Sequence, residues 1–107
     1  IMGVDKEDMA YVGNLLAEVG GGMAAVRKGE VLGLVELPIA GLMSDEPVEK
    51  VAAKVEKLKE AWRQLGCTIE SPFMTMSILA LTVLPELRIS DKGLLDTVQG
   101  KFIDLEA

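Results

Sequence analysis

Apolar residues recur at helical spacing in two segments of the chain, 6–19 and 48–65. In the first segment, the predicted buried stripe consists of Met9, Val12, Leu15, Leu16 and Val19. In the second segment, the corresponding inward stripe consists of Val48, Val51, Ala52, Val55, Leu58, Ala61, Trp62 and Leu65. Both segments are followed by glycine, at Gly20–Gly22 and at Gly66, and glycine readily adopts the left-handed conformation that ends helices. The sequence therefore predicts two amphipathic helices.

Acidic or hydroxyl residues precede both predicted helices. Asp5 is expected to cap the first helix, with Asp8 three residues later as in a capping box. Ser44 or Asp45 is expected to cap the second helix, and Pro47 is tolerated in a first helical turn. These residues predict where each helix begins.

Two apolar runs between the helices, Met23–Arg27 and Glu30–Leu37, are typical of strands. Lys28-Gly29 between them predicts a tight hairpin turn. Because both runs are apolar on both faces, we expect a sheet that is covered on both sides or shared with a neighbour.

The last third of the chain predicts a short helix followed by strands. Ser71-Pro72 resembles a helix start, and the apolar run after it favours a helix through about Leu81. A strand is expected at Glu86–Ile89 with Leu87 and Ile89 facing inward, followed by a turn at 90–93. Two short final strands are expected at Leu94–Asp96 and Lys101–Leu105.

These elements predict an α+β fold in which two main helices pack on a mostly antiparallel sheet with a central β-hairpin. At 107 residues the chain is expected to form one domain, 1–107, without an internal boundary.

The segment Leu37–Met43 is an apolar connection, which is unusual because connections normally run through water. Leu37, Ile39, Leu42 and Met43 are therefore expected to be covered, either by the core of this chain or by something that the chain lacks.

The amino-acid composition limits the classes of binding partner and the cellular compartment that we expect for the chain. The formal net charge is −6, which disfavours nucleic acid and anionic membranes, and basic residues do not cluster. No apolar run approaches the roughly 20 residues that span a bilayer. The single Cys67 excludes an internal disulfide and fits a reducing compartment, so a cytoplasmic location is expected.

The chain contains no histidine, which limits its chemistry. Ser-His-Asp and Cys-His catalytic arrangements are excluded within this chain, as is a histidine general base. With one cysteine, essentially only carboxylates remain as metal ligands.

Two long motifs carry a resemblance to a known family. They are Leu37–Pro47 (LPIAGLMSDEP) and Pro72–Leu81 (PFMTMSILAL), and together with their spacers they resemble the C-terminal domain of bacterial adenine deaminases. The shorter words that agree in order are Asp8-Met9, the triple glycine, Leu65–Thr68, Pro85–Leu87 and Asp91–Leu94. The resemblance runs from Ile1 nearly to Ala107.

The resemblance implies a parent enzyme of the amidohydrolase superfamily that hydrolyses adenine to hypoxanthine and ammonia. It implies a binuclear manganese or iron site whose ligands, mostly histidines, lie in an N-terminal TIM barrel. A His-Asp-Ser-His-Asn segment of that family would immediately precede Ile1. The chain is therefore expected to be a fragment that binds no metal and supplies no catalytic residue, with the missing barrel as its partner and homo-oligomers as its assembly.

Four residues of the two motifs are candidates for a substrate pocket: Met43, Ser44, Met74 and Thr75. The methionines, with Met76, could instead be packing residues, and Ser44 could simply be a helix cap.

Other residues allow a chemical and a structural interpretation. Asp45 and Glu46 could act as acid–base groups or metal ligands, or they could complement the helix dipole, with Glu46 pairing with Lys50 four residues later. Gly20–Gly22 could suggest a phosphate cradle, but a helix stop is favoured because the glycines follow a helix. Cys67 is expected to be structural, since only Arg63 nearby would activate a thiol.

A second hypothesis is a stand-alone interaction or oligomerisation module without chemistry. Its interface would then be the Leu37–Met43 loop and the apolar run 73–84. A parent reading frame with a long upstream part that carries His-x-His would favour the enzyme, and a start codon just before Ile1 would favour the module. On either hypothesis the chain alone is expected to self-associate.

Overall fold

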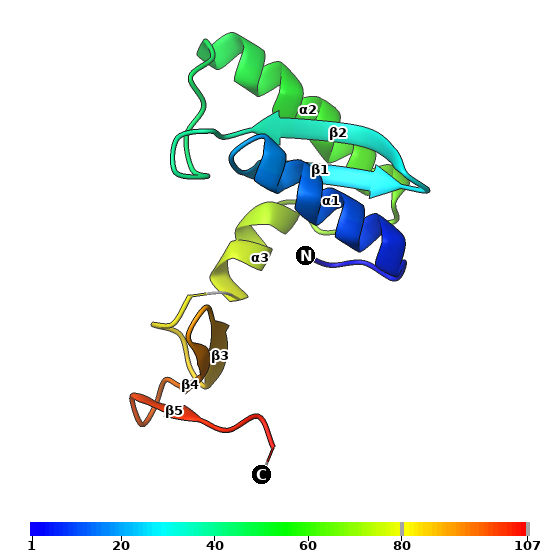
Figure 1. Cartoon of the computed structure of the whole chain (residues 1–107). Coiled ribbons are helices and arrows are strands. Elements are labelled where there is room, and N and C mark those ends of the chain that lie inside the picture. The colour runs from blue at the N-terminus through cyan, green and yellow to red at the C-terminus, as the bar shows by residue number, and fades with distance from the viewer. Residues whose placement is uncertain (80, 107) are drawn as a thin grey trace. The chain divides into compact units, whose positions relative to one another are not determined.

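The computed structural model describes residues 1–79 and 81–106 and divides into two compact units, Ile1–Thr68 and Ile69–Ala107 (Figure 1). No boundary within 1–107 was predicted from the sequence, whereas the contacts separate the chain after Thr68. The described residues form three helices, one two-stranded sheet and one three-stranded sheet, both antiparallel. The expected α+β class is confirmed.

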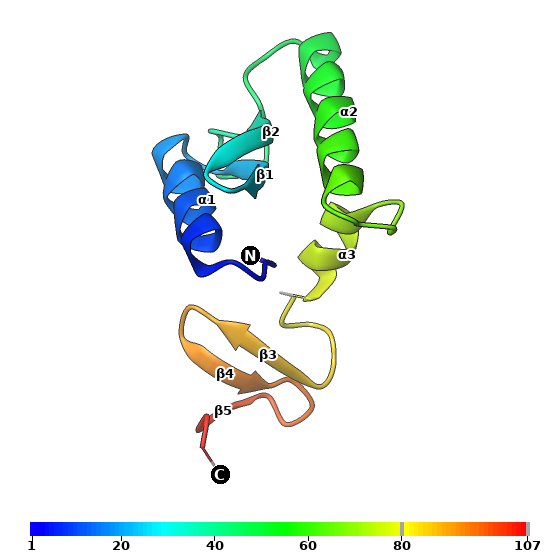
Figure 2. The ribbon, with the colours of Figure 1, turned by 90° about the vertical axis from the view of Figure 1, so that its right-hand side faces the viewer.

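The first unit places a hairpin between two helices. It consists of α1 (Lys6–Glu18), β1 (Gly22–Arg27), β2 (Glu30–Glu36) and α2 (Val48–Gln64). Helix α1 packs on β1, and α2 packs mainly on β2, so that the helices cover opposite faces of the sheet (Figure 2). The predicted hairpin and the prediction of a sheet covered on both sides are confirmed within this unit.

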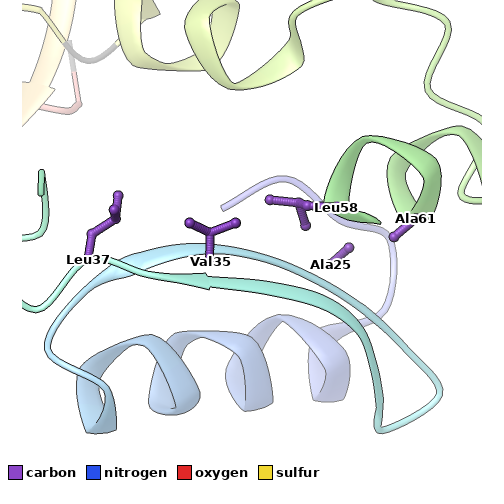
Figure 3. Close-up of a cluster of buried hydrophobic side chains, with 5 residues drawn as sticks. All are labelled: Ala25, Val35, Leu37, Leu58 and Ala61. Atoms are coloured by element: carbon purple, nitrogen blue, oxygen red, sulfur yellow. The ribbon is translucent and has the colours of Figure 1, made fainter. Parts of the chain in front are cut away.

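The core of the first unit lies between the hairpin and α2. Its buried members are Ala25, Val35, Leu37, Leu58 and Ala61 (Figure 3). Partly buried side chains pack around them from Met23, Leu32, Val51, Val55 and Trp62. Residues alternate along a strand, so Gly33 and Val35 of β2 and Leu37 just after it are buried on one face. Val35 and Leu37 point towards the side of the sheet that α2 covers (Figure 3), and Gly33 lies against Leu58 of α2.

The stripe predicted for α1 is confirmed as its half-buried face, whereas the stripe predicted for α2 is only partly correct. Val48, Ala52 and Leu65 are exposed although they were predicted to face inward. A helix of 17 residues is about 25 Å long, and a sheet of two strands is roughly 10 Å wide. The hairpin therefore covers only part of the length of α2, which leaves Val48 and Leu65 at its two ends exposed. Ala52 lies about 100° around the helix from Val51 and so faces away from the hairpin.

The predicted cap of α1 is confirmed, but the capping box is wrong. The Asp5 carboxylate accepts hydrogen bonds from the backbone N–H groups of Glu7 and Asp8, both at 2.9 Å. The Asp8 carboxylate does not bond back to the cap. It accepts from the N–H groups of Lys28 and Gly29 in the hairpin turn, both at 2.7 Å, and so joins α1 to the tip of the hairpin.

The predicted cap of α2 is wrong for a local reason. The helix begins at Val48, and Pro47 occupies the cap position without a side-chain hydrogen bond. A proline pushes the preceding residue out of the helical region, so Glu46 cannot belong to the helix. Ser44 instead accepts from the N–H of Glu46 at 3.2 Å, within the loop.

Glycines end both long helices as predicted. Gly20 and Gly66 have positive φ values of 83° and 88°. After α2, the N–H of Gly66 bonds to the Arg63 carbonyl and the N–H of Cys67 bonds to the Trp62 carbonyl, which is the Schellman arrangement. The corresponding pair after α1 also forms, so the helix-stop interpretation of the triple glycine is confirmed.

The second unit contains α3 (Pro72–Leu79) and the strands β3 (Leu87–Ser90), β4 (Gly93–Asp96) and β5 (Lys101–Ile103). The sheet order is β3-β4-β5. The predicted short helix is confirmed but ends at Leu79, and Ala80, within the predicted span, lies outside the described residues. The two final strands are also confirmed, although β5 ends before Leu105.

The predicted facing of β3 is wrong. Leu87 and Ile89 are exposed, whereas Arg88 and Ser90 on the other face are half-buried. Alternation along a strand defines two faces without saying which of them is covered. Here the Arg88 guanidinium donates to the carbonyls of Leu87 and Pro85, which keeps the arginine close to its own backbone.

Candidate functional site

The loop between β2 and α2 contains a hydrogen-bonded turn, Pro38–Met43. Ile39 and Met43 form an antiparallel bridge, with N–H to carbonyl distances of 3.1 and 3.2 Å. Between them Ala40 and Gly41 both have positive φ, and the N–H of Leu42 bonds to the Ile39 carbonyl at 3.1 Å. This geometry reverses the chain sharply and fixes the residues at the tip.

The turn also rests against the glycine segment that follows α1. The N–H of Leu37 donates to the Gly21 carbonyl at 2.9 Å. A Cβ atom on Gly21 would lie 2.6 Å from the Cα atom of Gly41, so a side chain at Gly21 would collide with the turn. The triple glycine therefore both ends α1 and admits the turn.

An open pocket of about 380 Å³ lies beside this turn. Its lining residues are Val19, Glu36, Pro38, Ser44, Asp45 and Glu46. Apolar groups occupy one part of the lining, and three carboxylates and one hydroxyl supply hydrogen-bond acceptors. Such a surface could accept hydrogen bonds from N–H groups of a neighbour.

Lys54 of α2 bridges two of the three carboxylates. Its ammonium group donates to Glu36 at 2.6 Å and also to Glu46. These hydrogen bonds, first to Glu36 and then to Glu46, raise the pKa of Lys54 above its ordinary value of 10.5. The bridge ties β2 and the loop before α2 to the helix itself. The sequence predicted that Glu46 pairs with Lys50. In the structure Glu46 pairs with Lys54 instead.

The four candidate pocket residues fall into two pairs. Ser44 lines the open pocket, and the adjacent Met43 lies on the exposed turn. Met74 and Thr75 lie on α3 in the second unit, where the Thr75 hydroxyl donates to the Ser71 carbonyl of its own helix. Met74 is exposed and Met76 is half-buried.

Within residues 1–79 and 81–106, no group of three or more cysteine or acidic side chains is placed to hold a metal ion. Glu36 and Glu46 are occupied by the lysine ammonium, and Asp8 is occupied by backbone N–H groups. The donor set of the described residues therefore does not fit a binuclear metal centre. In the same part of the chain, no helix combines the length and the apolar character that crossing a membrane requires.

The hydrogen bonds of two residues were not predicted from the sequence: those of Asp8 to the hairpin tip and those of Lys54 beside the pocket. Asp8 lies 20 residues from its partner Lys28, and Lys54 lies 18 residues from Glu36. No local spacing rule covers such pairs, because they form only when the helices dock on the hairpin. For Lys54, the excess of acidic side chains around the β2–α2 loop was a possible signal, whereas the sequence carried none for Asp8.

The fold and the site define an α+β chain with carboxylate-rich and apolar surface but without a metal-binding cluster in its described residues. Residues 1–101 match the family model of the adenine deaminase C-terminal domain. The chain therefore belongs to the adenine deaminase C-terminal domain family.

Curated relatives named adenine deaminase agree with this family. The chain is 59% identical over 105 residues to the protein of Moorella thermoacetica, covering 98% of this chain and 18% of that protein. It is 54% identical over 105 residues to a protein of Clostridium botulinum, covering the same shares of both chains. It is 55% identical over 104 residues to that of Mesorhizobium japonicum, covering 97% of this chain and 17% of that protein. The chain thus spans less than a fifth of the length of these relatives.

Proposed function

We propose that this chain is the C-terminal part of a metal-dependent enzyme that hydrolyses adenine to hypoxanthine and ammonia. The observation that carries the proposal is the family match over residues 1–101, together with relatives named adenine deaminase. Those relatives are more than five times as long as the matched segment. The part of such a protein outside the matched segment is therefore long enough to hold the catalytic centre.

The metal centre, which we expect to be binuclear with manganese or iron, belongs in this proposal to the remainder of the polypeptide. The chain has no histidine, and two of the three carboxylates that line the described pocket, Glu36 and Glu46, are engaged by Lys54. A bound metal would supply hydroxide at neutral pH and stabilise the charge that develops on the purine. The residues of this chain shape the surroundings of that centre or the contact between subunits.

The substrate-pocket role of Met43, Ser44, Met74 and Thr75 remains part of the proposal. Ser44 has the best support among them, since it lines the open pocket together with Asp45, whose carboxylate can accept a hydrogen bond from an amine. Purine metabolism in the cytoplasm is the corresponding cellular setting, and the single cysteine fits a reducing compartment of that kind.

The experiment compares the complete polypeptide that carries this chain with the 107-residue chain alone. Both are assayed for hypoxanthine formation from adenine with added Mn²⁺ or Fe²⁺. We expect the complete polypeptide to be active and the chain alone to be inactive, because the chain lacks the histidine ligands. Hypoxanthine formed by the pure chain would contradict the assignment of the metal centre. A reading frame that starts just before Ile1 would instead favour the stand-alone module.

A further inference from the structure

Backbone hydrogen bonds fix the Pro38–Met43 turn, both within the turn and at its base. It carries its own two-residue bridge, Ile39 with Met43, and its base is bonded to Gly21 through Leu37. Gly41 approaches Gly21 so closely that no side chain fits between them. These contacts hold the backbone of the turn in one conformation within the first unit.

The turn also stores backbone strain at an alanine. Ala40 has a φ of 57°, in the left-handed region, which L-residues other than glycine adopt only at a cost in free energy. Strain of this kind persists only where the surroundings enforce it. The strained residue lies at the tip of the turn, directly before Gly41.

The side chains at the tip are apolar and exposed. Leu42 is 76% exposed, Met43 is 58% exposed and Ile39 is 45% exposed. Three large apolar side chains on one rigid turn resemble the anchors of protein interfaces, where preorganisation lowers the entropic cost of binding. Exposure of these side chains to water is unfavourable, and their burial against an apolar partner surface would lower the free energy.

We propose that the Pro38–Met43 turn is a docking anchor that inserts Ile39, Leu42 and Met43 into the remainder of the same deaminase polypeptide. The occupant follows from chain length, because the relatives extend over more than five times the matched segment. This inference rests on the proposed function, since it takes the covering surface from that larger polypeptide. Beyond the proposed function, the inference names the Pro38–Met43 turn as the surface of this chain that contacts the remainder of the polypeptide.

The experiment measures thiol accessibility in the complete polypeptide. Leu42→Cys is compared with Val48→Cys, a matched control that is 74% exposed in the first turn of α2. Each variant is treated with N-ethylmaleimide, and labelling at each position is followed by mass spectrometry of the peptides, which separates it from Cys67. We expect labelling at position 42 to be at least about tenfold slower, because a buried thiol reacts only during local opening. In urea the two rates should converge.

Equal rates at positions 42 and 48 in the native polypeptide would overturn the proposal. Protection at position 42 that disappears on dilution would also overturn it, because a second copy would then be the occupant. If Leu42→Cys fails to fold, Met43→Cys gives the same comparison, and amide hydrogen exchange at Leu42 and Met43 of the unmodified polypeptide gives a third. The labelling rates do not depend on deaminase activity, so failure of this proposal and failure of the proposed function are distinguishable.

Discussion

Gly33 shows how one missing side chain positions α2. A Cβ atom at Gly33 would lie 3.0 Å from the Leu58 Cα atom and 3.1 Å from its Cδ1 atom. The helix therefore approaches β2 as closely as a glycine allows, and this approach buries Leu58 completely. A strand pattern alone could not reveal this role, because glycine in a strand is equally typical of a bulge.

We expect Gly33→Ala to lower the free energy of unfolding by about 1–3 kcal/mol, since the added methyl group overpacks the contact with α2. Gly13→Ala is the matched control. Its Cβ atom meets only the flexible end of Ile1 at 3.3 Å, so improved helix propensity should stabilise α1 by about 0.5–1 kcal/mol. Urea unfolding followed by the fluorescence of Trp62 measures both. A loss of stability from Gly13→Ala equal to that from Gly33→Ala would contradict this account.

Asp8 acts on a turn far away in sequence. We expect Asp8→Ala to lower the free energy of unfolding by about 1–3 kcal/mol, since two charge-assisted hydrogen bonds to the hairpin turn are lost. Amide exchange at Lys28 and Gly29 should accelerate in this variant. Glu7→Ala removes the same charge from the same helical turn and should leave these amides unchanged. Unchanged protection at Lys28 in Asp8→Ala would show that the carboxylate does not hold the turn.

Among elements, Lys54 connects β2, the loop at Glu46 and α2, and this connection is sensitive to pH. Its pKa is raised above 10.5 in the folded chain by Glu36 and Glu46, so the folded state binds its proton more tightly than the unfolded state does. The stabilisation is therefore complete below about pH 10 and is lost as the pH rises through the folded pKa.

We expect Lys54→Met to be less stable than the unmodified chain at pH 8, and the difference to shrink between pH 10 and 12. Added salt should also reduce the difference, because the ion pairs are partly exposed. Urea midpoints measured at each pH test this expectation. Lys57→Met, at an exposed position on the same helix, corrects for the titration of other groups. A difference that stays constant up to pH 12 would argue against the ion pairs as its cause.

The elements were largely predictable because their signals are local. Helical periodicity, the Asp5 cap, the glycines after both helices and the Lys28-Gly29 turn all depend on residues within a few positions of one another. The start of α2 was mispredicted because the effect of Pro47 on Glu46 outweighed the preference of Ser44 for a cap. Because α2 begins only at Val48, Glu46 lies outside the helix and is not in helical register with Lys50. Glu46 pairs with Lys54 instead.

The candidate site was less predictable than the fold, since it depends on contacts between elements. The sequence indicated an apolar segment that needs a cover, and Leu37 is indeed buried in the core of the first unit. The conformation of the turn determines which of the other residues stay exposed to solvent. Ala40 and Gly41 have positive φ values, and Leu42, which follows them, is exposed. The separation of Met43 and Ser44 from Met74 and Thr75 into two units carried no sequence signal.

For the whole molecule, exposed apolar surface predicts that the 107-residue chain alone self-associates. Large exposed apolar residues occur in both units, among them Leu42, Met43, Phe73, Met74, Ile78 and Leu79. Association removes this surface from water, whereas the net charge of −6 opposes it by repulsion between copies. Raising the salt concentration screens the repulsion and should therefore strengthen the association.

Sedimentation velocity over a range of protein and salt concentrations measures this association. We expect the average mass to rise with both concentrations, and Leu42→Asp to weaken the association more than Val48→Asp, because Leu42 lies beside two further apolar side chains of the turn. In the complete polypeptide, Leu42→Asp should not weaken association between copies, since there the turn would already be covered. A chain that stays a monodisperse monomer at high concentration and high salt would show that this surface is compatible with water, and it would remove the energetic reason for a docking partner.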